Sequence, residues 1–167
     1  QGQTSAKGEK SCTVRQAFNA GGVGFNGPAL CMAVQGDGKI IVGGDFTQYN
    51  NQPANRLVRL MADGSIDPTF NVALGADYPI YDIHIIDSEH ILIAGVFSTY
   101  QGLDAFNIVC LNSVAAPNAT FNTNLGAASN GRIRKIKAIG SKIYLIGDFN
   151  FFDGNLRKHI ARINIDG

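Results

Sequence analysis

Short apolar stretches recur along the chain, and their apolar positions repeat every second residue, which predicts β-strands rather than helices. This period places Met32 and Val34 on one face of a first strand, and Ile83 and Ile85 on one face of its counterpart. A tight turn rich in Gly and Asp follows, and then a nearly all-apolar strand, which is typical of burial on both faces. A polar loop, a third strand and a fourth strand complete the pattern. We therefore expect four-stranded antiparallel meanders, and no window predicts an amphipathic helix.

Three sequence markers recur with one period and divide the chain into tandem repeats. They are the dipeptide Phe-Asn, the Phe that ends each run like IIVGGDF, and an apolar residue of the third strand. Each recurs at spacings of 51 and 52 residues: Phe18, Phe70 and Phe121; Phe46, Phe97 and Phe149; Leu60, Leu111 and Ile163. The units are 11–64, 65–115 and 116–167, which form a single repeat domain over 11–167. Residues 1–10 are polar and predict a flexible N-terminal tail.

Tandem four-stranded meanders of about 51 residues predict an all-β fold of β-propeller-type blades. Three four-stranded repeats also describe a β-trefoil, in which one chain closes with three-fold symmetry, and this alternative stays open. Propellers typically carry 4–8 blades. Three units therefore predict a ring shared between chains, or an open array or filament.

The stretch GDGKIIVGGDFTQYNNQPANRLVRLMADGSIDPTFN resembles the consensus of the delta-60 repeat, a β-propeller repeat family of unknown function. The resemblance extends over residues 11–167 as three tandem copies. The second copy departs from the pattern at Val96, which replaces the Asp of GDF, and at Cys110, which replaces the Arg found at Arg59 and Arg162. Such families occur in secreted bacterial proteins and in phage virions, so the resemblance implies an extracellular, cell-surface or virion location. It supplies no catalytic residues.

Composition and charge narrow the class of protein. Of the 167 residues, 45% are hydrophobic and 16% are charged, which argues against disorder. No stretch approaches the roughly 20 apolar residues of a membrane span, so we expect no membrane insertion. Unit 65–115 sums to −6 and unit 116–167 to +5. This asymmetry predicts either solvated faces or an interface at which acidic and basic units meet.

The two ends of the repeat domain predict assembly. The segment SCTVRQAFN aligns with the fourth strand SIDPTFN, so that Val14 matches Ile66 and Phe18 matches Phe70. We expect residues 11–18 to pair as a strand with residues 156–165 of the same or a neighbouring copy. The expected assembly residues are Val14, Phe18, Ile160 and Ile163. The expected partners are other copies of the chain or other subunits of a surface or virion assembly.

Residues that could carry chemistry are dispersed. His84, His90 and His159 do not have a metal-binding spacing, and we expect no metal, no cofactor and no enzymatic activity. The basic residues of segment 132–137 alternate between strand faces, so we expect no nucleic-acid partner. The three cysteines (Cys12, Cys31 and Cys110) allow one disulfide from Cys12 to either of the others, or free thiols.

The loop after each GDF-type marker is the one candidate ligand site. An aromatic residue recurs there and is followed by an amide or a carboxylate: Tyr49 and Asn50, Tyr100 and Gln101, Phe152 and Asp153. Such pairs stack on a sugar ring and bond its hydroxyl groups, or else the aromatic rings pack between repeats. We therefore expect a non-catalytic structural or adhesive module that works through protein contacts and oligomerisation. The alternative is a lectin-like, glycan-binding propeller.

Overall fold

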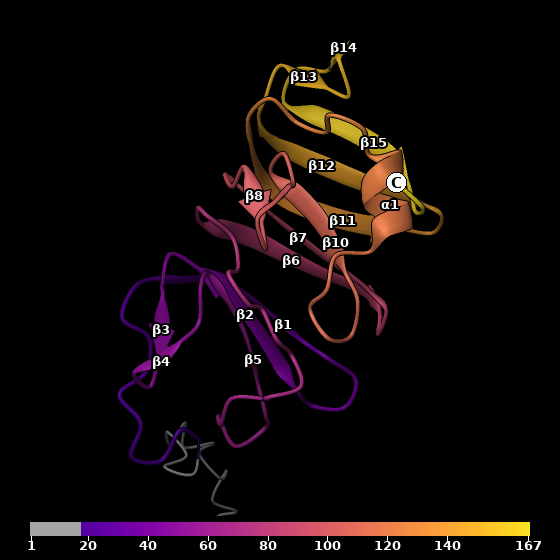
Figure 1. Ribbon diagram of the computed structural model, residues 1–167. Coiled ribbons are helices and arrows are strands. Elements are labelled where there is room, and N and C mark those ends of the chain that lie inside the picture. Colours follow the sequence, from indigo (N-terminus) through magenta and orange to yellow (C-terminus); the bar gives the residue numbers. More distant parts are fainter. Residues whose placement is uncertain (1–17) are drawn as a thin grey trace, which may run out of the picture.

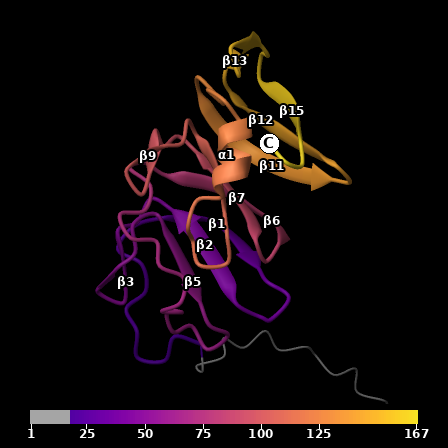
Figure 2. The ribbon, with the colours of Figure 1, turned by 45° about the vertical axis from the view of Figure 1, so that its right-hand side comes forward.

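The computed structural model describes residues 18–167 as three small antiparallel sheets in a row, one for each repeat (Figure 1). The first and third sheets lie at opposite ends of this row in both views (Figures 1 and 2). The all-β fold expected from the apolar period is confirmed. Val14, the tail 1–10 and the expected strand 11–17 lie outside the described residues.

Sheet 1 contains the first repeat and has the strand order β1-β2-β5. A two-residue hairpin, β3-β4, lies between its second and third strands. The strands are β1 (Ala29–Val34), β2 (Ile40–Gly44), β3 (Gln48–Tyr49), β4 (Gln52–Pro53) and β5 (Leu57–Leu60).

Sheet 2 repeats this arrangement with the order β6-β7-β10 and the hairpin β8-β9. The strands are β6 (Ile80–Asp87), β7 (His90–Gly95), β8 (Thr99–Tyr100), β9 (Leu103–Asp104) and β10 (Ile108–Leu111). All four residues of β10 are buried, which agrees with its position between two other sheets.

Sheet 3 has the order β11-β12-β15 and the hairpin β13-β14. The strands are β11 (Arg132–Ile139), β12 (Lys142–Asp148), β13 (Phe151–Phe152), β14 (Asn155–Leu156) and β15 (Ile160–Asn164). A short helix, α1 (Ala119–Asn124), precedes the sheet, and the Asn118 side chain caps it by accepting from the Phe121 amide. The apolar pattern did not predict this helix, because six residues are too few to show a helical period.

The expected fourth strand is reduced to one bridge in each of the first two repeats. Ile66 bridges Leu60 and Pro117 bridges Leu111, but neither segment continues as a strand. Pro68 and Pro117 have no N–H group to donate to a ladder. In the first repeat the Asp67 carboxylate also accepts from the amide and hydroxyl of Thr69, which turns the chain away from the sheet.

A glycine near the end of each second strand allows the first strand to approach closely. A Cβ atom on Gly44, Gly95 or Gly147 would lie 2.1–2.2 Å from a carbonyl oxygen just before or within the first strand of the same sheet. Beside this contact each first strand changes register, between Ala29 and Cys31 in β1 and at the equivalent places in β6 and β11. The Gly before the last two residues of the GGDF, AGVF and IGDF markers is therefore required by the close approach of the first and second strands of each sheet.

Each sheet has two faces that can be matched between repeats. We call the face that points toward the preceding repeat the N-side face; it carries Met32 in sheet 1, Ile83 in sheet 2 and Ile136 in sheet 3. We call the opposite face the C-side face; it carries Ala33 in sheet 1 and Lys137 in sheet 3. The C-side face of sheet 1 packs on the N-side face of sheet 2 in one apolar cluster, and sheets 2 and 3 form a second.

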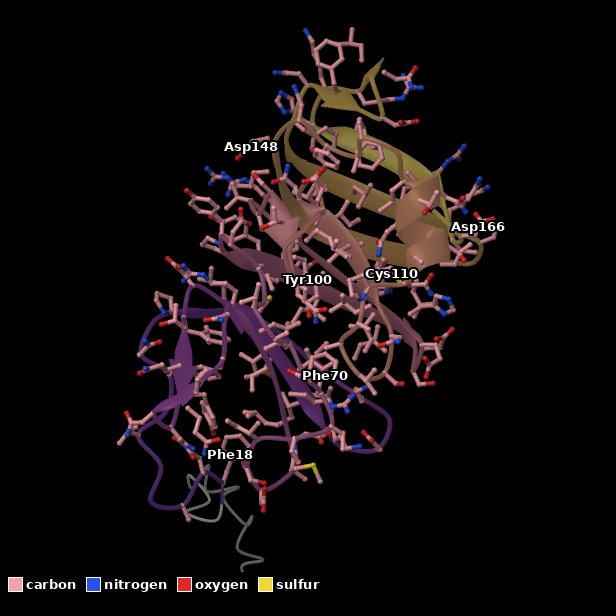
Figure 3. The ribbon with its side chains drawn as sticks, viewed as in Figure 1. Phe18, Phe70, Tyr100, Cys110, Asp148 and Asp166 are labelled. Atoms are coloured by element: carbon pink, nitrogen blue, oxygen red, sulfur yellow. The ribbon has the colours of Figure 1, made fainter. Side chains whose placement is uncertain are left out.

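The Phe residues of the three Phe-Asn markers are not equivalent in burial. Phe70 and Phe121 are 5% and 2% exposed, whereas Phe18 is 46% exposed. Phe70 lies between sheets 1 and 2, and Phe18 lies at the outer end of sheet 1 (Figure 3). The expectation of three equivalent buried sites is therefore wrong for Phe18, which has a sheet on one side only.

Candidate interaction faces and strand edge

The recurring aromatic rings of the predicted ligand loops are buried. Tyr49, Tyr100 and Phe152 are 2%, 0% and 5% exposed. The Tyr49 hydroxyl donates to the carbonyl oxygen of Gly64 (2.8 Å), and the Tyr100 hydroxyl donates to that of Ala115 (3.1 Å). Each tyrosine thus ties its hairpin to the turn that ends its repeat. With this packing, no face of these rings is free for a sugar to stack on.

The polar residue after each ring also has a structural reason to recur. Asn50, Gln101 and Asp153 have φ angles of 49°, 50° and 47°, and the residues that follow them, Asn51, Gly102 and Gly154, also have positive φ. Two consecutive positive φ angles define the type I′ turn, which favours Asn, Asp and Gly. The pattern that suggested a ligand site is therefore the pattern of a tight hairpin. Glycan binding stays a prediction, without the stacking platform on which it was based.

Three side chains that sequence reasoning missed hold these hairpins in place. They are Asn26, Asp77 and Asn130, and the Oδ1 atom of each accepts from two consecutive backbone amides at the start of the hairpin, at 2.9–3.1 Å. Their spacings of 51 and 53 residues would have identified them. They stand two or three residues before the first strand, in segments that otherwise look like plain loops.

Acidic and basic repeats meet inside the chain. Lys135 Nζ lies 3.1 Å from Asp82 Oδ1, and the Asp82 Oδ2 atom accepts from the backbone amide of Ile136 (2.7 Å). These contacts join the C-side face of sheet 2 to β11, the first strand of sheet 3. The acidic second repeat therefore neutralises part of the basic third repeat within one molecule.

A buried ion pair joins β5, the last strand of sheet 1, to the segment that follows it. Arg59 and Asp67 are 5% and 3% exposed, and Arg59 Nε donates to Asp67 Oδ2 (2.9 Å). Arg59 also donates to the Thr69 hydroxyl (3.1 Å), and its guanidinium lies 4.5 Å from the centre of the Phe70 ring. Burial raises the pKa of Asp67, but hydrogen bonds from Thr69 and the charge of Arg59 outweigh it, so the pKa is below its ordinary value.

The counterpart of Arg59 in the third repeat is Arg162, on β15. Its side chain is exposed and makes no ion pair within residues 18–167. Ile160 and Ile163, two of the four expected assembly residues, lie on the same strand. Ile160 is exposed, and Ile163 packs against the apolar cluster shared by sheets 2 and 3. A pocket of about 280 Å³ lies beside β15 and is lined in part by Phe152, Ala161 and Ile163.

The two outer faces expose large apolar side chains. On the N-side face of sheet 1, Met32 and Val34 are 67% and 60% exposed. On the C-side face of sheet 3, Tyr144, Ile146 and Ile160 are all exposed. The corresponding faces of sheet 2 are covered by its two neighbours. The outer faces are therefore the exposed equivalents of faces that are buried inside the row.

The remaining reactive groups do not form a centre. Burial raises the pKa values of Cys31 and Cys110 to about 12, and neither thiol is in a disulfide. Burial and the nearby Lys137 lower the pKa of His84. Between residues 18 and 167 no group of three or more His, Cys, Asp and Glu side chains is arranged to hold a metal ion. In the same part of the chain no helix has the length and apolar character needed to cross a membrane.

The repeated sheets, hairpins and turns define a protein built from β-propeller-type repeats. The family model described as "Domain of unknown function (DUF5122) beta-propeller" matches residues 35–70, 90–121 and 141–167, which is more than half of the chain. The chain belongs to this family of β-propeller repeats of unknown function. The three matched segments confirm the repeat period and favour the propeller over the β-trefoil. No match was found among curated proteins or among solved structures.

Proposed function

We propose that this protein is a non-catalytic structural module of a secreted, cell-surface or virion assembly. Other copies of the chain, or related subunits, bind to the outer faces of its first and third sheets. The observation that carries the proposal is the apolar character of these two faces. Met32, Val34 and Ile146 occupy exposed positions whose counterparts in sheet 2 are covered by a neighbouring sheet.

Apolar side chains gathered at a solvated face mark an interaction surface. Isolated exposed hydrophobic residues are common on proteins and need no partner. Here they recur on the two faces at the ends of the row, in register with buried positions of the middle repeat. Burial of these apolar side chains drives association without requiring opposite charges on the two partners. Because the acidic repeat already pairs with the basic one inside the chain, we expect association to depend weakly on salt.

The internal contacts specify the geometry of the proposed contact. Where sheets 2 and 3 meet, Asp82 of a C-side face contacts the backbone of Ile136 on an N-side face. By strand register the counterparts of these two residues are Lys135, at the Asp82 position of sheet 3, and Met32, at the Ile136 position of sheet 1. The Lys135 backbone holds that position while its Nζ contacts Asp82 of sheet 2. A contact between copies that repeats the internal one would place Lys135 of one copy beside Met32 of the next. Such head-to-tail contacts form a ring if they close and a filament if they do not.

Disulfide trapping tests this geometry. Two variants, Met32→Cys and Lys135→Cys, are made in a Cys12→Ser background, in which the two remaining native thiols are partly or fully buried. Mixing the two variants under mild oxidation should give, in high yield, a dimer whose disulfide joins position 32 of one copy to position 135 of the other. Each variant alone should give little dimer, because a head-to-tail contact does not place a residue beside its own copy.

Leu103→Cys is the matched control, because Leu103 is equally exposed but lies on hairpin β8-β9, away from both outer faces. Its mixture with either variant should give no disulfide-linked dimer, although non-covalent assembly continues. Equal trapping of the control, or dimers of the Met32→Cys variant alone, would contradict head-to-tail assembly. A glycan-array screen runs beside this test, and saturable glycan binding by a protein that does not assemble would favour the lectin-like alternative.

A further inference from the structure

Two arginines at the start of β11 share one carboxylate at the end of β12. Arg132 and Asp148 are opposite each other in the register of the two strands, and a register shift places Arg134 in a bulge. Arg134 Nε donates to both oxygens of Asp148 (3.0 Å each), and Arg134 Nη2 lies 2.7 Å from Oδ2. Figure 3 shows Asp148 apart from both Phe18 and Asp166, so this cluster belongs to neither end of the described chain.

The side chain of Arg132 is held in place but is incompletely bonded. Its Nε atom is buried and has no hydrogen-bond partner in the part of the chain that the structure describes. This atom lies 3.5 Å from Asp148 Oδ2, and the guanidinium lies 5.6 Å from the centre of the Tyr81 ring on β6. The side chain is 40% exposed, so a ligand in solution can reach it. Arg132 is therefore an oriented cation with unused donors, at the junction of sheets 2 and 3.

The first two repeats do not have this concentration of positive charge. In the first repeat the counterpart of Asp148 is Asp45, which pairs with a single cation, Arg56. In the second repeat the counterpart is Val96, which carries no charge. Two guanidinium groups beside one carboxylate are thus a property of the third repeat alone, and the architecture of the repeat does not require them.

The chemistry of the cluster favours an anion. The hydrogen bond from Arg134 and the positive charges around Asp148 lower the pKa of this carboxyl group, so it is ionised at neutral pH. One positive charge remains in excess. A guanidinium presents five N–H donors in a planar fork that matches the oxygens of a phosphate or a similar tetrahedral anion. Because Tyr81 already orients Arg132, binding costs less conformational entropy than it would with a freely rotating side chain.

We propose that Arg132 and Arg134 bind a terminal sulfate or phosphate ester group of an acidic sugar. Arg132 donates from the exposed part of its guanidinium, and Arg134 adds the donors that Asp148 leaves free. Tyr81 orients Arg132 and does not itself stack on the ligand. This site differs from the loops after the GDF-type markers, because it depends on charged groups and not on exposed aromatic rings.

An NMR titration of the full chain tests the site residue by residue. The probes are glucose 6-sulfate, glucose 6-phosphate and unmodified glucose, all added at constant ionic strength. At least one of the two esters should shift the signals of segment 132–134 saturably below about 20 mM, whereas glucose should leave them unchanged. A response to only one of the esters identifies which anion the site prefers.

Three variants distinguish a built site from general attraction to a basic sheet. Arg132→Gln should weaken binding about tenfold or more, because charge-assisted hydrogen bonds are lost. Asp148→Asn should strengthen binding about threefold or more, because it removes the carboxylate that competes with the ligand. Lys142→Gln is the matched control, since it removes a positive charge from the opposite end of β12 and should change the affinity by less than about twofold.

The proposal is overturned if neither ester gives a saturable shift up to about 20 mM, or if glucose binds as well as the esters. Equal losses of affinity for Arg132→Gln and Lys142→Gln would also overturn it, because binding would then follow only the net charge of the sheet. Trapping of Met32 beside Lys135 does not depend on this result, so the two proposals fail separately.

Discussion

Sheets 2 and 3 have the same strand order and nearly the same register, but they differ in what covers them. Five of the six residues of β7, from Ile91 to Gly95, are buried. In β12 burial alternates, so that Leu145 is 0% exposed and the adjacent Ile146 is 47% exposed. The difference comes from the neighbours, because sheet 2 has a sheet on each side and sheet 3 has one on its N-side face only.

The comparison shows that the third repeat keeps apolar residues on a face that the structure leaves open. Tyr144 and Ile146 belong to the same all-apolar strand pattern that is buried in the second repeat. Local strand preference alone does not require apolar side chains on both faces of an exposed sheet. The pattern is explained if a further sheet covers this face, which is the physical basis of the proposed assembly.

The largest expected effect contrasts a residue between two sheets with its counterpart at the end of the row. Phe70→Ala should lower the free energy of unfolding by about 3–5 kcal/mol, because it removes a buried ring from the contact between sheets 1 and 2. Phe18→Ala should cost about 0.5 kcal/mol or less, since Phe18 is exposed. Urea titrations of both variants measure this difference. Equal losses would mean that Phe18 is covered as fully as Phe70.

The two arginines provide the next contrast. Arg59→Ala should cost about 3–5 kcal/mol, because the Asp67 carboxylate would be left buried without its partner. Arg162→Ala should change the free energy of unfolding by about 0.5 kcal/mol or less in the isolated chain. Thermal and urea denaturation at neutral pH provide the measurement. A comparable loss for Arg162→Ala would show that its side chain already has a buried partner.

The pH dependence of stability sharpens this contrast. The folded-state pKa of Asp67 is depressed, so its stabilising contribution is complete above the unfolded pKa of about 3.9 and is lost as pH falls through the folded pKa. The wild type should therefore lose more stability than Asp67→Asn between about pH 5 and pH 2. Urea midpoints measured across this range give the difference. Parallel curves for the two proteins would show that the carboxylate of Asp67 is not stabilised by folding.

Adjacent residues on β12 probe the two faces of sheet 3. Leu145→Ala should cost about 2–5 kcal/mol, because Leu145 packs between sheets 2 and 3. Ile146→Ala should cost less than about 1 kcal/mol in the monomer. If the proposed contact between copies forms, the cost of Ile146→Ala should rise with protein concentration, because association stabilises the folded state. Denaturation at several protein concentrations separates the two contributions.

The smallest expected effect concerns the hairpin turns. Gly102 has a φ of +79°, so Gly102→Ala should cost about 1–2 kcal/mol through backbone strain. Gly36 does not have a positive φ and its Cβ position is open, so Gly36→Ala should cost nothing or stabilise by up to about 1 kcal/mol. Unfolding midpoints of the two variants give the comparison. Equal losses of unfolding free energy in the two variants would contradict the explanation that Gln101 and its counterparts recur because of the turn geometry.

The sequence was sufficient to predict the repeats, the β class and most strands. Alternation is strong in segments such as 80–87, and the markers at Phe46, Phe97 and Phe149 fix the period. It was not sufficient for the fourth strand, because Pro68 and Pro117 interrupt the ladder at positions where the apolar pattern continues. It also did not predict helix α1, which depends on the Asn118 cap.

The candidate site was harder to predict than the fold. Tyr49 and Asn50 recur for reasons of packing and turn geometry, and the sequence shows the recurrence without the reason. Burial depends on neighbours in space, so Phe18 and Phe70 look equivalent in the sequence and differ in the structure. The exposed position of Arg162 becomes informative only when the buried pair of Arg59 with Asp67 is seen beside it.

The central claim is that the outer faces of sheets 1 and 3 hold copies of the chain together. Sedimentation velocity of the full chain from about 1 µM to about 1 mM tests it most directly. The account predicts a mass above the 17.8 kDa of one chain, a single value for a ring or a rising value for a filament. Ile146→Lys should return the mass to that of one chain, whereas Leu103→Lys should not. A mass of one chain across the whole range would contradict the account.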